Sequence, residues 1–159
     1  MKHRAYIALS GFLWFFSGGF LLYKGLHLIN DATFRADSLC SKWQTVFGSP
    51  QQAATIFIGI GLLLGFIKGR FVLSKTVRRV VSRIASFPGP IRFSDAYSRS
   101  YWILIASMIA LGMSFRFLPI PMDMRGIVDV AIGSALVNGA MLFFRAARAF
   151  QIPQNTPQN

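Results

Sequence analysis

The sequence predicts an all-α integral membrane protein in which four transmembrane helices form a bundle. Two observations support this: the chain contains four long apolar segments, and its Lys and Arg residues gather outside them. Of the 159 residues, 53% are hydrophobic and the mean hydropathy is +0.49. Soluble domains have about 45–50% apolar residues even when glycine is counted. The composition therefore favours a membrane protein.

The predicted spans cover about 5–29, 51–69, 101–120 and 126–146. A helix of about 20 apolar residues crosses the roughly 30 Å of hydrocarbon in a bilayer. The first span is expected to be retained, because its apolar run is longer than the core of a signal peptide. We expect a single transmembrane domain over 1–150. The polar, proline-containing tail 151–159 is expected to be disordered.

Charge predicts the orientation of these spans. The chain has 17 Lys and Arg against 5 Asp and no Glu, which gives a net charge of +12. Most cations precede the first span, lie between the second and third, or follow the fourth. Cytoplasmic loops carry such an excess. We therefore expect both termini to be cytoplasmic, in a plasma or inner membrane, and we expect no nucleic-acid binding.

The segment 71–87, between the second and third spans, is expected to form a basic amphipathic helix. Apolar residues recur every three or four positions, as in Leu73, Val77 and Val80, opposite a basic arc. The arc forms a predicted lipid-facing basic patch: Lys75, Arg78, Arg79 and Arg83. Two arrangements are possible. The helix lies in the interface with its cations on anionic lipid headgroups, or it continues the second span and docks on neighbouring helices.

Small residues recur at fixed spacing in the spans. Gly61, Gly65 and Gly69 form two consecutive GxxxG steps, which let helix backbones approach closely in lipid. This stripe predicts a tight contact inside or between protomers. A homo-oligomer is expected, because four thin helices enclose little space. Similar spacings in the first and second halves also indicate a weak duplication into two helical hairpins.

Ionisable residues near the outer ends of the spans are the candidate functional site. Such residues at membrane depth are costly and usually face the bundle or a wet cavity. The candidate substrate- or ion-binding residues are Lys24, His27, Arg116, Arg125, Asp129 and Asn138. One interpretation is a structural ion-pair cluster centred on Asp129, or cations that reach the headgroups. The other is a cationic vestibule that attracts small anions.

The sequence lacks the residue patterns that catalysis and metal binding require. There is no Glu, one Cys and two His, and no motif of a hydrolase, nucleotide-binding loop or zinc site. We expect no enzyme activity, no cofactor and no metal. The leading hypothesis is a homo-oligomeric channel or transporter for a small anion or anionic solute. The alternative is a non-transporting assembly or a partner- or lipid-binding protein with structural charges.

Overall fold

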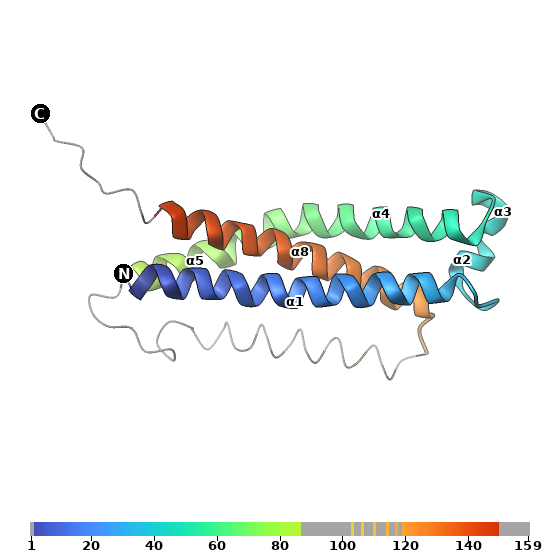
Figure 1. The fold of residues 1–159 in the computed structure, drawn as a ribbon, viewed down its shortest axis with the longest axis horizontal. Coiled ribbons are helices and arrows are strands. Elements are labelled where there is room, and N and C mark those ends of the chain that lie inside the picture. The colour runs from blue at the N-terminus through green and yellow to red at the C-terminus, as the bar shows by residue number, and fades with distance from the viewer. Residues whose placement is uncertain are drawn as a thin grey trace, which may run out of the picture.

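The computed structural model describes residues 2–86 and 119–149, together with residues 103, 106, 110, 114 and 117. The described elements are all helical. In chain order they are α1 (Lys2–Ala32), α2 (Leu39–Lys42), α3 (Gln44–Phe47), α4 (Pro50–Lys68), η1 (Gly69–Leu73), α5 (Ser74–Ser86) and α8 (Met122–Ala149) (Figure 1).

In the described residues, three helices are long and apolar enough to cross a membrane: Ala5–Ala32, Pro50–Ser82 and Met122–Ala149. They contain the first, second and fourth predicted spans. Most of the predicted third span, 101–120, lies outside the described residues, as does the tail 151–159. The four-span arrangement and the hairpin duplication therefore stay predictions.

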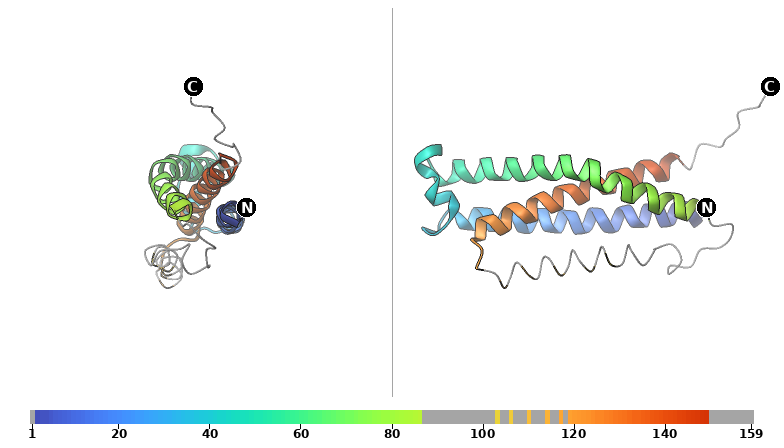
Figure 2. Two further views of the ribbon diagram at one scale, coloured as in Figure 1. Left: turned by 90° about the vertical axis from the view of Figure 1, so that its left-hand side faces the viewer. Right: turned by 180° about the vertical axis from the view of Figure 1, so that it is seen from behind.

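Helix α8 is the centre of the described bundle. It packs along α1 on one side and along α4 on the other, whereas α1 and α4 contact each other little (Figures 1 and 2). Its buried side includes Val130, Leu136 and Phe143. Phe143 forms an edge-to-face contact with Trp14 of α1, with ring centroids 5.4 Å apart. Removing α8 would leave the other two long helices without their main partner.

The α1–α8 interface depends on glycines spaced seven residues apart. Gly18 lies against Gly133, and Gly25 lies against Gly126. A Cβ atom added to Gly18 would stand 2.8 Å from the carbonyl oxygen of Gly133, which is too close for any real side chain. The two antiparallel backbones therefore touch at these positions, as small-residue packing in lipid predicts.

The predicted stripe on α4 is also used inside the chain. Gly65 lies on the backbone of Ala131 in α8, and Gly69 lies on Ala135. A Cβ on Gly65 would fall onto the carbonyl of Ala131. Of the two alternatives for this stripe, contact inside or between protomers, the structure has the first.

Helices α4, η1 and α5 form one continuous helix with a π-helical turn in its middle. A π-turn often redirects a helix, and beyond it α5 packs on both α1 and α8 (Figure 2, right). The apolar face of this part, Leu73, Val77 and Val80, is buried in a cluster with Phe143 and Ile7. Of the two predicted arrangements for 71–87, the structure has the helix that continues the second span and docks on its neighbours.

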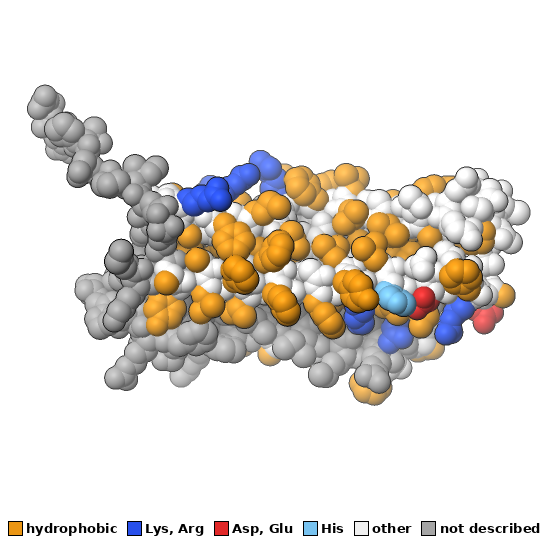
Figure 3. Space-filling view, in the orientation of Figure 1, with side chains coloured by type: hydrophobic (Ala, Val, Ile, Leu, Met, Phe, Trp, Pro, Cys, Tyr) orange, Lys and Arg blue, Asp and Glu red, His pale blue; other side chains and the backbone are white. Residues whose placement is uncertain are grey.

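The two ends of the bundle differ in structure. One end holds the start of α1, the end of α5 and the end of α8 (Figure 1). The short helices α2 and α3 lie at the other end, which we call the α2 end. Helices α2 and α4 begin with serine caps: Ser38 Oγ accepts from the backbone N–H of Ser41, and Ser49 Oγ accepts from that of Gln52. On the face drawn in Figure 3, hydrophobic side chains cover the middle of the molecule, with Lys and Arg along the upper edge on the left and charged side chains of both signs along the lower edge on the right.

Candidate functional site

Lys24 and Asp129 form an ion pair between α1 and α8. The Nζ atom of Lys24 lies 3.0 Å from Oδ2 of Asp129. The Asp129 side chain is 13% exposed, whereas that of Lys24 is 49% exposed. The pair lies between two glycine contacts, Gly18–Gly133 and Gly25–Gly126, that bring the helices together. Asp129 is thus paired, as the structural interpretation of the sequence predicted, and its partner is Lys24.

His27 is not part of this pair. Its Nδ1 atom lies 3.0 Å from Oδ2 of Asp31, one turn further along α1, and both side chains are exposed. Tyr23 packs edge-to-face on the His27 ring. His27 therefore belongs to a surface contact within one helix, so an acid–base pair with Asp129 is not formed.

Of the two candidate arginines, the structure describes Arg125 but not Arg116. Arg125 lies in the first turn of α8 and is half-buried, but it makes no ion pair with Asp129 in the described structure. It faces a pocket instead. Arg116 lies outside the described residues, so its role in the cluster stays a prediction.

The polar side chains deeper in α8 are bonded to α4. Ser134 Oγ donates to the carbonyl of Leu62 over 3.1 Å, and Asn138 Nδ2 donates to the carbonyl of Phe66 over 3.2 Å. Both bonds cross the α4–α8 interface next to the glycine stripe. Helices in lipid use such interhelical hydrogen bonds to associate. This geometry makes Asn138 a helix-joining residue.

A buried carboxylate that is not among the candidate site residues joins α2 to the start of α8. Asp123 is fully buried; its Oδ2 accepts from the backbone N–H of Cys40, and its Oδ1 accepts from that of Met124. The bond to Cys40 links residues 83 positions apart. An acidic residue at the start of a helix is favoured by the helix dipole. That placement was the available signal, but it does not identify Cys40 as the partner.

Cys40 lies in this buried cluster. The pKa of its thiol is raised to about 11, first by burial and then by the charge of the neighbouring Asp123 carboxylate and a hydrogen bond with it. Ile29, Ala53 and Val130 surround the same region. At neutral pH the thiol is consequently a packed, protonated group.

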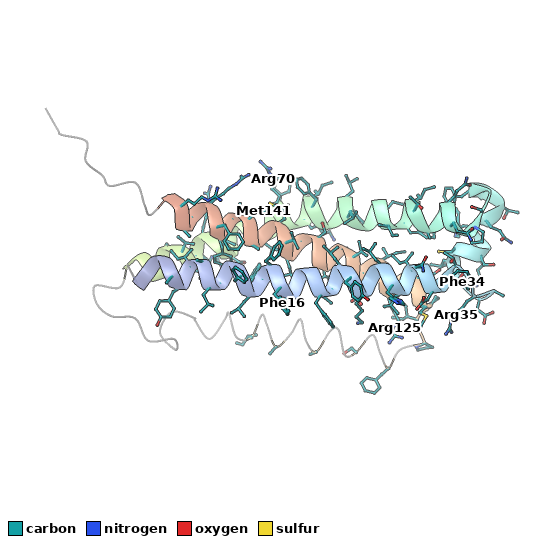
Figure 4. The ribbon with its side chains drawn as sticks, in the orientation of Figure 1. Phe16, Phe34, Arg35, Arg70, Arg125 and Met141 are labelled. Atoms are coloured by element: carbon teal, nitrogen blue, oxygen red, sulfur yellow. The ribbon has the colours of Figure 1, made fainter. Side chains whose placement is uncertain are left out.

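A pocket of about 430 Å³ opens beside this cluster at the α2 end. Its lining comes from the turn after α1 and from the start of α8: Arg35, Ala36, Asp37, Ser38, Ile120, Pro121, Met122 and Arg125. Arg35 and Arg125 both lie at this end of the bundle (Figure 4). Sequence reasoning found Arg125 but missed Arg35 and Asp37, because nothing local marks a loop arginine as part of a pocket.

The predicted basic patch lies on the opposite side of α5 from its buried face. Lys75, Arg78 and Arg79 are exposed, and Arg70 of η1 is exposed nearby (Figure 4). The backbone of Arg83 continues the same helix. These cations are available to a charged surface outside the bundle.

Comparisons with known proteins do not assign a family to this chain. No protein-family model matches it, and neither curated proteins nor solved structures give a significant match. Among the described residues, no group of three or more His, Cys, Asp or Glu side chains is placed to hold a metal ion. The functional argument therefore depends on the geometry above.

Proposed function

We propose that this chain is a non-transporting integral membrane protein whose internal charges are structural and whose basic patch binds anionic lipid headgroups. The observation that carries the first half is that four polar side chains of the described helices are engaged in bonds between helices. Lys24 bonds Asp129, and Ser134 and Asn138 bond carbonyls of α4. A conducting path needs polar groups that remain open to water or to the ion.

The basic patch supports the second half. Its cations occupy the exposed arc of α5, because the apolar arc is already packed on α1 and α8. Lys75, Arg78 and Arg79 follow the apolar helix α4 in the chain, so a bilayer that surrounds α4 would bring them near the headgroup phosphates. Cations near an anionic leaflet each contribute about 1 kcal/mol of attraction. In this proposal the patch faces the cytoplasm, with N and C termini on the same side of four spans.

The proposal is tested by lipid-dependent melting of purified protein in non-ionic detergent. Added phosphatidylglycerol should raise the melting temperature, since a ligand of the folded state stabilises it. The triple variant Lys75→Gln, Arg78→Gln, Arg79→Gln should lose most of this rise. Lys42→Gln, an exposed cation at the α2 end, is the matched control and should keep it. An equal rise in the triple variant would contradict the lipid assignment.

Passage of a small anion, by a homo-oligomer, is the second candidate. It is favoured by Arg35 and Arg125, which face one pocket at the α2 end. Chloride and phosphate flux into liposomes separates the two functions. Flux that is lost in Arg35→Gln or Arg125→Gln, with the melting temperature preserved, would support the channel. The first proposal expects no flux above that of empty liposomes, and cross-linking in the same liposomes measures the oligomeric state.

A further inference from the structure

We infer that the pocket at the α2 end binds a phosphate ester that carries a primary ammonium, as in the phosphoethanolamine headgroup of a lipid. This site lies at the opposite end of the bundle from the basic patch and is independent of it. The inference starts from the charges on the pocket wall. Arg35 and Arg125 supply two guanidinium groups, and Asp37 supplies one carboxylate.

These three side chains do not neutralise one another. Within the part of the chain that the structure describes, the ion pairs are Lys24–Asp129 and His27–Asp31. Arg35, Arg125 and Asp37 are in neither. A guanidinium group matches phosphate oxygens with two parallel N–H donors, and it is the preferred group for planar recognition of phosphate. Two arginines that line one pocket, without an ion-pair partner among the described residues, favour an anionic group between them.

The walls of the pocket are held in place by buried and partly buried hydrogen bonds. Asp123 bonds the N–H groups of Cys40, in α2, and of Met124, in α8. Ser38 Oγ donates to the carbonyl of Arg35 over 2.8 Å and fixes the turn between α1 and α2. The arginines are thus carried by two segments that a fully buried carboxylate ties together. Such prior ordering lowers the entropy cost of binding.

The lining identifies the cationic part of the ligand. Asp37 supplies a carboxylate for an ammonium group at the same pocket. Quaternary ammonium groups such as choline are recognised by aromatic cages, and no aromatic side chain is among the described residues that line this pocket. A primary ammonium, which donates hydrogen bonds to a carboxylate, fits better. The volume of about 430 Å³ is within the usual range for small ligands, roughly 300–1,000 Å³.

The position favours a lipid as the source of this group. Arg35 follows the end of α1 at Ala32, and Arg125 is in the first turn of α8. If α1 and α8 span the bilayer, their ends lie at the depth of the headgroups. A soluble phosphate ester offers the same chemistry, and the experiment below separates the two sources.

The test titrates four probes into purified full-length protein in a non-ionic detergent and follows binding by thermophoresis. The probes are short-chain phosphatidylethanolamine, short-chain phosphatidylcholine, O-phosphoethanolamine and inorganic phosphate. The ethanolamine lipid should bind tightest. Arg35→Gln or Arg125→Gln should weaken it about tenfold or more, the usual loss when a hydrogen bond to a charged group is removed. Asp37→Asn should weaken the ethanolamine probes but leave inorganic phosphate unchanged.

The control is Lys42→Gln, which removes an exposed cation of the same end outside the pocket and should bind like the parent. Melting temperatures show that each variant is folded. O-phosphoethanolamine binding as tightly as the short-chain lipid would assign the site to a soluble ester. Three results would overturn the inference: equal binding of the choline and ethanolamine lipids, no effect of the double Arg35→Gln, Arg125→Gln variant, or no binding of any probe.

Discussion

Lys24 Nζ lies 3.0 Å from Asp129 Oδ2, and this contact joins α1 to α8 between two points where the helix backbones touch. Asp129 is nearly buried, but the Lys24 side chain is half-exposed. Without its partner the lysine can still be solvated, because its long stem lets the ammonium group reach polar surroundings. The aspartate has no such freedom. Replacing Lys24 and replacing Asp129 should therefore cost different amounts of stability.

Asp129→Asn should destabilise the protein by about 1.5–3 kcal/mol, the range for a hydrogen bond to a charged group. This is less than the loss expected for a pair in which both charges are fully buried. Lys24→Met should cost more than Asp129→Asn, because it leaves the buried carboxylate without a cation. Reversible unfolding in mixed micelles measures both losses. The double variant should lose less free energy of unfolding than the two single variants lose together.

The control for this cycle is Asp31→Asn. Asp31 pairs with His27 on the exposed surface of α1, where such a pair contributes roughly 0–1 kcal/mol. If Asp129→Asn unfolds like Asp31→Asn, or if the double variant equals the sum of the singles, the pair does not hold α1 to α8.

Two adjacent glycines of α1 provide a matched test of helix packing. A Cβ on Gly18 would meet the Gly133 carbonyl oxygen at 2.8 Å, whereas a Cβ on Gly19 has no atom within 4 Å. Gly18→Ala should therefore destabilise by about 1–3 kcal/mol, as overpacking does. Gly19→Ala should be neutral or stabilise by about 0.5–1 kcal/mol, because alanine favours the helix. Thermal unfolding of both variants in one detergent checks the difference. Equal melting temperatures would contradict the α1–α8 contact.

On α4 the contrast is between Gly65 and Gly59. Gly65 lies on the carbonyl of Ala131, and Gly59 faces open space. Gly65→Leu should separate α4 from α8 and lower the melting temperature strongly, with loss of the Ser134 and Asn138 bonds to α4. Gly59→Leu should melt close to the parent. Because the Gly65 contact lies inside the chain, Gly65→Leu should change the mass of any oligomer only as far as it unfolds the protein. A stable Gly65→Leu protein with altered mass would instead place the face between protomers.

The sequence was sufficient to predict the parts of this fold that depend on composition and period. Hydropathy located the helices that contain α1, α4 and α8, because crossing the hydrocarbon requires a fixed length of apolar helix. Regular spacing located glycines that the helices use for contact, such as Gly65 and Gly69. These properties are local, so one segment of sequence carries them.

Pairings between distant residues could not be predicted in the same way. Three cations were candidates for Asp129, and the sequence contains no distance that selects Lys24. The apolar arc of α5 fits acyl chains and protein equally well, so only the folded chain shows that Val77 and Val80 pack on α1 and α8. Cys40 and Asp123 are 83 positions apart. Their contact exists because α2 folds back onto the start of α8.

The last prediction concerns Cys40, whose thiol pKa is raised to about 11 from 9.0, first by burial and then by the Asp123 carboxylate. Only the thiolate is a good nucleophile, so a maleimide should label native Cys40 far more slowly than the unfolded protein at pH 8. Asp123→Asn should speed labelling, because it removes one cause of the raised pKa and loosens the turn.

The raised pKa of Cys40 also predicts how stability depends on pH. The thiol of the unfolded protein loses its proton first, as the pH rises above 9. Stability from this group is thus fully present below pH 9 and is lost between about pH 9 and 11. Cys40→Ala should show a smaller fall in melting temperature over that pH range than the parent. Rapid labelling of the folded parent at pH 8, or the same alkaline fall in Cys40→Ala, would show that the thiol is not held beside Asp123.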